Sequence, residues 1–266
     1  MPNKQRKALH ALILIFVAVG FIIHYTPYKN DGITPLCFVG AIAIHSQIVW
    51  GTWRTAVYII IAALLSYCAE CIGVNTSHIF GAYHYNANLP GLIYGVPFYV
   101  PFSYVYLVYT TNFICLAISK PMSYKRNVLV LAAMSGIIMM MHDLAIDPIF
   151  STINHIWTWD QKGAISGVPI HNFTGWFVVF FTITLVATLS TWHVKDRCRN
   201  LVISKSVLLL PMLLFIAVTC FGITDALGSM PDDRNISGIC VFISLFGLSP
   251  YLLLAWFNGF RSNPDK

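Results

Sequence analysis

Charged residues are scarce in this chain. Asp, Glu, Lys and Arg make up only 10% of its 266 residues, whereas an average soluble domain contains roughly 25%. Hydrophobic residues make up 57%, which is more apolar surface than one water-soluble core would bury. This composition excludes a water-soluble enzyme, a disordered protein and a nucleic-acid-binding protein.

Several residue patterns are also missing. Seven cysteines are too few, in surroundings too apolar, for a disulfide scaffold. Cys68 and Cys71 form a C-x-x-C pair, but the pair falls inside an expected membrane helix and lacks the context of a redox motif. The histidine boxes of membrane di-iron desaturases are absent, and so is a lysine in the middle of a late helix, which a retinal protein requires.

Long apolar stretches take up most of the chain. A helix needs about 20 apolar residues to cross the ~30 Å hydrocarbon core of a bilayer. The expected spans are residues 8–24, 33–51, 55–74, 96–119, 127–147, 172–193, 202–224 and 236–258. They leave no room for a soluble domain. We therefore predict one integral membrane domain over residues 1–266, an all-α polytopic helical bundle with about eight transmembrane helices.

The positions of the basic residues predict an orientation. If the N-terminus is cytoplasmic, 13 of the 16 Lys and Arg residues lie at the inner ends of the spans, and only Lys29, Lys162 and Arg234 lie at the outer ends. Cytoplasmic loops are enriched in Lys and Arg, so we expect a multi-pass protein of the cell membrane with both termini in the cytoplasm. Membrane lipids with anionic headgroups are the expected partners of these charges, and nucleic acid is not.

Three acids lie where a membrane helix rarely has any. Glu70 is near the outer end of the third span, and Asp143 and Asp147 are near the outer end of the fifth. The two aspartates are four residues apart and share one helix face, and Pro148 is expected to end that helix. Because two adjacent carboxylates repel each other, one is expected to keep its proton near neutral pH, as a general acid must. The alternative is a packing role at the wet interface.

The sequence around these acids is duplicated. Each copy contains an acid on an outgoing helix, an aromatic-x-aromatic motif, and a Gly-Val-Pro triplet expected to open the returning helix. The first copy has Glu70, Tyr83–Tyr85 and Gly95–Pro97, and the second has Asp143, Trp157–Trp159 and Gly167–Pro169. The offsets are 73, 74 and 72 residues. We predict a parallel internal repeat of the central hairpins, with copies at about 55–119 and 127–193, whose two halves enclose one site.

Aromatic residues accompany the acids on the expected outer side. They are Tyr83, Tyr85, Trp157, Trp159 and Trp176. Electron-rich ring faces stabilise cations, so this group suits a reaction with a cationic intermediate. A metal site built from the acids with His78, His84, His155 and His171 is an alternative interpretation of the same region.

Residues 70–176 resemble the carotenoid biosynthesis membrane proteins of the CruF type. The resemblance rests on the first acid and the motifs after it: Glu70, Gly73, Thr76, Phe80, Gly81, Tyr83, Tyr85 and Gly95–Pro97. It rests equally on the second set: Asp143, Asp147, Pro148, Trp157, Trp159, Gly163, Gly167–Pro169, Asn172, Phe173, Gly175 and Trp176. Two positions depart from the family pattern, namely Ser77, where a glycine is usual, and His142, where a large aromatic residue is usual.

The resemblance implies a carotenoid 1,2-hydratase, a hydro-lyase that adds water to the terminal isopropylidene double bond of an acyclic or monocyclic carotenoid. The chemistry of such a hydration leads us to expect Asp143 or Asp147 as the proton donor, with the other carboxylate tuning it, and Glu70 as the group that positions or activates water. The substrate, entering from the lipid phase, would contact Phe80, Tyr83, Tyr85, Trp157, Trp159, Asn172 and Trp176. Neither a cofactor nor a metal is implied, and association with other carotenoid-pathway enzymes is a further expectation.

Two other functions are compatible with the same residues. One is a lipid- or isoprenoid-binding or transport protein whose acid cluster relays protons. The other is a metal-dependent carotenoid oxygenase.

Overall fold

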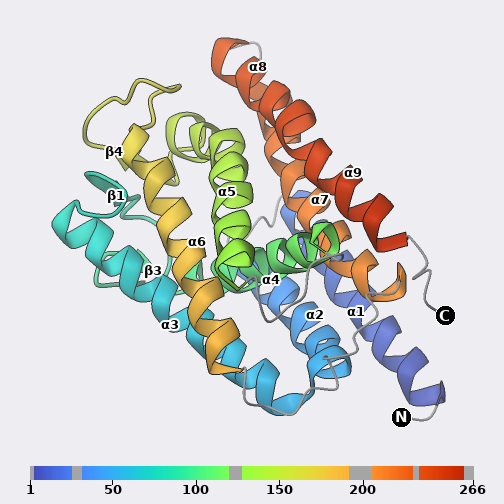
Figure 1. Cartoon of the computed structure of the whole chain (residues 1–266). Helices are drawn as coiled ribbons and strands as arrows, with labels where there is room; N and C mark the ends of the chain where they lie inside the picture. The colour runs from blue at the N-terminus through green and yellow to red at the C-terminus, as the bar shows by residue number, and fades with distance from the viewer. Residues whose placement is uncertain (1–2, 26–31, 120–127, 192–204, 230–233, 261–266) are drawn as a thin grey trace.

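The computed structural model describes residues 3–25, 32–119, 128–191, 205–229 and 234–260. It is a bundle of membrane-length helices (Figure 1), as predicted. The helices are α1 (Asn3–Tyr25), α2 (Ile33–Trp50), α3 (Thr52–Thr76), α4 (Val100–Ile118), α5 (Val128–Asp147), α6 (Ile170–Ser190), α7 (Lys205–Ser229), α8 (Arg234–Phe242) and α9 (Ser249–Phe260). Two π-helical segments, η2 (Pro148–Ile153) and η4 (Ile243–Leu248), continue α5 and join α8 to α9.

Seven helical segments in the described chain are long and apolar enough to cross a membrane, and α1 adds a shorter apolar stretch, Ala11–Tyr25. Each of the eight predicted spans overlaps one of these segments. The protein is therefore a multi-pass membrane protein, as the composition predicts. Which side of the membrane holds the termini stays a prediction.

Helix α4 forms the centre of the bundle. Fourteen of its 19 residues are buried, and it contacts α2, α3, α5, α6, α7 and α9. Side chains that join helices at mid-depth are polar as well as apolar: the Thr184 hydroxyl of α6 lies 3.0 Å both from Asn112 Oδ1 of α4 and from Ser135 Oγ of α5. Such polar contacts stabilise helix packing where lipid supplies no hydrophobic drive.

The loops at one end of the bundle contain four short strands. Strands β1 (Tyr83–Tyr85) and β4 (Trp157–Trp159) pair antiparallel, with Tyr83 opposite Trp159 and Tyr85 opposite Trp157. Strands β2 (Leu92–Ile93) and β3 (Val96–Pro97) form a separate hairpin. Because β1 follows α3 and β4 follows α5, the first sheet ties together two helical hairpins that are distant in sequence.

One local prediction is wrong, and a second holds only in part. Gly95–Pro97 does not open a helix, because Val96 and Pro97 pair with β2 and α4 begins only at Val100. Helix α5 ends at Asp147, directly before Pro148, but the chain continues from it through one π-helical segment to Ile153. A π-helix bonds each N–H to the carbonyl five residues earlier, as Asn154 does with Ile149 at 2.8 Å, and π-segments within helices are frequent at functional sites.

Candidate active site at one end of the bundle

A cavity of about 180 Å³ opens where the helix ends meet. Its walls come from the last turns of α1, α3 and α5, the first turns of α2, α4 and α6, the later part of α7, and β1 and β4. This convergence follows from topology, because successive antiparallel helices alternately end and begin on the same side. The lining is mainly apolar and aromatic, with three carboxyl side chains.

All ten residues predicted for the site line this one cavity. They are Glu70, Phe80, Tyr83, Tyr85, Asp143, Asp147, Trp157, Trp159, Asn172 and Trp176. Helices α3, α5 and α6 supply the polar members, and the paired strands supply four of the rings. The structure thus brings the two sequence-related segments to a single site, although their catalytic roles stay a prediction.

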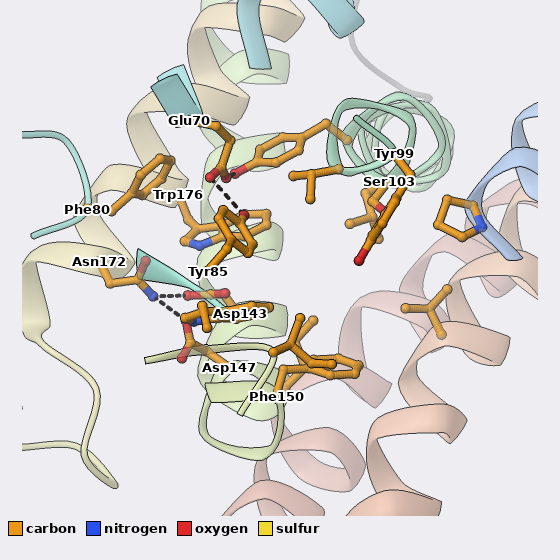
Figure 2. A pocket seen from close by; sticks show the side chains of 18 of the residues that line it. Glu70, Phe80, Tyr85, Tyr99, Ser103, Asp143, Asp147, Phe150, Asn172 and Trp176 are labelled. Atoms are coloured by element: carbon orange, nitrogen blue, oxygen red, sulfur yellow. Dashed lines mark hydrogen bonds between the residues drawn. The ribbon is translucent and has the colours of Figure 1, made fainter. Parts of the chain in front are cut away.

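The two aspartates are joined by one side-chain amide (Figure 2). Asn172 Nδ2 donates to Asp143 Oδ2 at 2.7 Å and to Asp147 Oδ2 at 2.9 Å. Both carboxyl groups are 1% exposed. Asp147 Oδ1 accepts further hydrogen bonds from Ser151 Oγ at 2.8 Å and Trp159 Nε1 at 3.1 Å. Asp147 is therefore surrounded by donors, as an anionic carboxylate requires.

Asp143 differs from Asp147 in its second oxygen. Asp143 Oδ1 is buried and has no hydrogen-bond partner among the residues that the structure describes, while its residue lines the cavity. A buried carboxylate oxygen without a donor is unfavourable, and protonation removes the charge whose burial is costly. The hydrogen-bond inventory therefore favours a proton on Asp143 Oδ1.

Glu70 is held by three tyrosine hydroxyls. Tyr104 donates to Glu70 Oε1 at 2.5 Å, and Tyr83 and Tyr85 donate to Glu70 Oε2 at 2.6 and 2.9 Å. Burial raises the pKa of the Tyr83 and Tyr85 phenols well above the usual value, and the neighbouring Glu70 charge raises each pKa further. These phenols thus stay protonated and act as donors, so Glu70 is placed as the anionic acceptor of all three.

Stacked and edge-on rings complete the wall. Tyr83 contacts Trp159 with ring centroids 5.1 Å apart, as the strand register requires. Tyr104 and Trp176 stack with centroids 4.9 Å apart and planes within 5°. Tyr104, which donates its hydroxyl to Glu70, therefore also contributes an aromatic ring to the cavity wall, and aromatic ring faces stabilise positive charge.

Two glycines allow the outer loop to approach the helices closely. A Cβ atom at Gly73 of α3 would meet the Phe80 ring at 2.7 Å, and one at Gly175 of α6 would collide with the Ile79 carbonyl. At both positions the neighbouring atoms leave room for the glycine hydrogen but not for a side chain. They position Phe80 between α3 and α6, at the cavity wall.

Sequence reasoning missed several residues of this site. Tyr104 is one of many aromatic residues in α4, and Ser151 lies beyond the proline expected to end α5. The sequence signal for Tyr104 would have been its position one helical turn after the start of α4. The signal for Ser151 would have been its position one helical turn after Asp147. Other missed lining residues lie on helices outside the duplicated segment, namely His24, Thr34, Pro35, Val218 and Phe221. The cavity therefore extends from the acids toward α1, α2 and α7.

The alternative metal site finds no support in the described geometry. His84 pairs with Asp160 at 2.8 Å on the loop surface, and His78 Nδ1 lies 2.7 Å from the Thr76 carbonyl. Neither they nor His155 and His171 line the cavity. Within the described residues no three His, Cys, Asp or Glu side chains are grouped closely enough to hold a metal ion.

A multi-pass helical bundle with an acid- and aromatic-lined cavity at one end is thus the class of protein. The sequence profile of the carotenoid biosynthesis protein family matches residues 32–230, which is 199 of the 266 residues. The chain belongs to this family. No curated protein and no solved structure matches the chain.

Proposed function

We propose that the protein is a carotenoid 1,2-hydratase that protonates the terminal isopropylidene double bond of an acyclic or monocyclic carotenoid and adds water to the resulting cation. The observation that carries the proposal is Asp143 Oδ1, a buried carboxyl oxygen with no hydrogen-bond partner in the described part of the chain, on a residue that lines an aromatic cavity. Membership of the carotenoid biosynthesis family supports the substrate class.

The cavity suits an end group of a carotenoid. An apolar cavity of ~150 Å³ holds one benzene-sized molecule, and this cavity measures about 180 Å³. It therefore has room for the terminal carbons and a water molecule, while the remainder of a long polyene extends beyond it. Helices exposed to lipid surround the cavity, so an apolar chain is expected to enter from the bilayer.

Proton transfer begins the proposed reaction. The Asp143 Oδ1–H proton goes to the less substituted alkene carbon, where a C–H bond forms as the π bond breaks, and the other carbon becomes a tertiary cation. Asp143 is left as a carboxylate. Asn172, which donates to both aspartates, holds the acid at a fixed distance from Asp147. A positioned general acid typically accelerates such a step 10²–10⁴-fold.

Water completes the addition. A water oxygen attacks the cation to form the C–O bond, and the surplus proton returns to Asp143, so the net change is one water molecule added. Glu70 and its three tyrosine donors provide fixed negative charge and oxygen acceptors that orient this water. The rings of Tyr104 and Trp176 face the intermediate and stabilise its charge.

Expression in a lycopene-producing bacterial host tests the proposal. We expect the host pigment to gain one water per reacting end group, measured by mass spectrometry, and the Asp143→Asn variant to leave it unchanged. A gain of one oxygen atom without the hydrogens would contradict hydration and favour an oxygenase. Unchanged pigment with the folded wild-type protein, supplied with both acyclic and monocyclic carotenoids, would favour a binding or transport function.

A further inference from the structure

The loop between α3 and α4 carries a small hairpin with an exposed apolar surface. Strands β2 and β3 are joined by Tyr94 and Gly95, whose φ angles of 51° and 79° are typical of a type I′ turn. Leu92, Ile93 and Tyr94 are 37%, 50% and 79% exposed. Three consecutive large apolar side chains exposed at a loop turn are unusual, because surface loops are normally polar.

The sequence around this hairpin contains no residue that is charged at neutral pH and no histidine. From Tyr85 to Ser119 there is no Asp, Glu, Lys, Arg or His. The stretch includes the whole hairpin and all of α4, which lies in the membrane. The hairpin is therefore as free of charged residues as the spanning helix that follows it.

Helix α3 donates hydrogen bonds to the edge of the hairpin. Tyr67 Oη donates to the Ile93 carbonyl at 3.1 Å, and Asn75 Nδ2 donates to the Tyr94 carbonyl at 3.1 Å. Strand β3 also contacts α3, beside which it lies in Figure 1. Two consecutive carbonyls at the turn are therefore paired with side chains of a spanning helix. In lipid such pairing is required, because no water is present to satisfy backbone groups.

The side of α3 next to these donors faces lipid. Its exposed residues follow a helical stripe of every fourth position: Ile60, Leu64, Cys68 and Ile72. Tyr67 and Asn75 border this stripe, so the hairpin's apolar side chains extend the lipid-facing surface of α3 sideways. The surface is continuous from a transmembrane helix onto a loop.

The second loop, between α5 and α6, has the same backbone turn as the hairpin but different side chains. Ser166 and Gly167, 72 residues after Tyr94 and Gly95, have φ angles of 52° and 87°, and Ile165 pairs with Val168. This turn is polar, and the loop carries Asp160 and Lys162. Its Ser166 carbonyl accepts from Thr152 Oγ1 of η2 at 3.3 Å, so it packs over the π-helical segment.

We propose that the hairpin of residues 91–97 is a membrane anchor, whose side chains at Leu92, Ile93 and Tyr94 insert among the lipids at the cavity end of the bundle. Tyr67 and Asn75 allow this by pairing its carbonyls. The hairpin ends two residues before Tyr99, a cavity-lining residue, so the anchor fixes the start of α4 at the cavity wall. The proposal is independent of the reaction catalysed.

Fluorescence quenching in liposomes tests the anchor. An environment-sensitive fluorescent amino acid replaces Tyr94 by codon suppression in the full chain, reconstituted with phosphatidylcholine and phosphatidylglycerol. A matched probe replaces Ala164, which is exposed in the second loop. We expect lipids with brominated acyl chains to quench most of the emission at position 94 and little at 164, and aqueous iodide to do the reverse.

Either of two results would overturn the anchor. Iodide quenching at position 94 equal to that at 164 would place the hairpin in water. Protection of position 94 from both quenchers would mean that another protein surface covers it.

The donor pair gives a second, independent readout. Combining Tyr67→Phe with Asn75→Ala should expose the position 94 probe to iodide, because two backbone carbonyls would then need water. Thr76→Val is the matched control, since Thr76 Oγ1 donates to the Ile72 carbonyl and accepts from the His78 amide, and neither of these bonds involves the hairpin. An unchanged quenching pattern in the double variant, with wild-type elution in gel filtration, would contradict the role given to Tyr67 and Asn75.

Discussion

The cavity contains two carboxyl clusters that are equally buried but differently supplied with hydrogen-bond donors. Glu70 receives one tyrosine hydroxyl on Oε1 and two on Oε2. The aspartate pair shares Asn172, and Asp143 Oδ1 has no partner among the described residues. Donors favour the anion, and an oxygen without a donor favours the acid. We therefore propose different roles for the two clusters, with the negative charge on Glu70 and the proton on Asp143.

Asp143→Asn should have the largest effect on activity. The amide keeps the shape and an acceptor for Asn172 but has no acidic proton, so we expect hydration to fall by about 10²–10⁴-fold with an unchanged melting temperature. Pigment conversion in proteoliposomes and thermal unfolding in detergent measure the two effects. Asp225→Asn is the control, because Asp225 bonds to Asn154 away from the cavity. Full activity in Asp143→Asn would refute the assignment of the acid.

Asn172→Leu should separate positioning from binding. Asn172 touches both aspartates and acts through them, so its loss lets the two carboxyl groups move apart. Misplacement of a reacting group by about 1 Å costs roughly 10²-fold in rate. We expect kcat to fall by about this factor while KM stays nearly constant, as steady-state kinetics with varied carotenoid would show. A raised KM with wild-type kcat would instead make Asn172 a binding residue.

Glu70→Gln should weaken the fold more than Asp143→Asn does. The glutamine NH₂ would face hydroxyls that now donate to a carboxylate, and each buried group left without a partner costs about 1–3 kcal/mol. We expect a lower free energy of unfolding, measured by denaturant titration in micelles, together with reduced activity. Equal stability of Glu70→Gln and Asp143→Asn would contradict the different roles proposed for the two carboxyl clusters.

Single tyrosine replacements should produce the smallest effects and rank in a definite order. Tyr104→Phe removes the single tyrosine donor to Glu70 Oε1, whereas Tyr85→Phe leaves Tyr83 on Oε2. A hydrogen bond to a charged group contributes about 1.5–3 kcal/mol. We expect the loss of unfolding free energy in Tyr104→Phe to lie in this range and to exceed that in Tyr85→Phe. The opposite order would contradict the distribution of donors around Glu70.

Much of this architecture follows from the sequence. Apolar length predicted the spans, because a membrane helix must satisfy its own backbone. The scarcity of charge singled out Glu70, Asp143 and Asp147, and the nearly equal offsets between the motifs predicted that both segments meet at one site. That the segments arose as a parallel repeat stays a prediction.

Other features depend on tertiary contacts that a local pattern does not contain. Tyr104 is one of several tyrosines in α4, and only packing selects it as the donor to Glu70. Proline normally ends a helix, yet η2 continues α5 and brings Ser151 back to Asp147. The sequence predicts a helix start at Val96 and Pro97, but these residues pair with β2. The cavity walls on α1, α2 and α7 follow from the assembly of the whole bundle.

The central claim is that Asp143 initiates the addition of water to a terminal alkene. Purified protein in liposomes, given an acyclic carotenoid in water labelled with heavy oxygen, tests it most directly by mass spectrometry of the pigment. The account predicts a product with one labelled hydroxyl and one new C–H hydrogen at the chain end, formed by the wild type and Asp225→Asn but not by Asp143→Asn. A product whose oxygen is unlabelled, or a labelled product formed equally by Asp143→Asn, would contradict it.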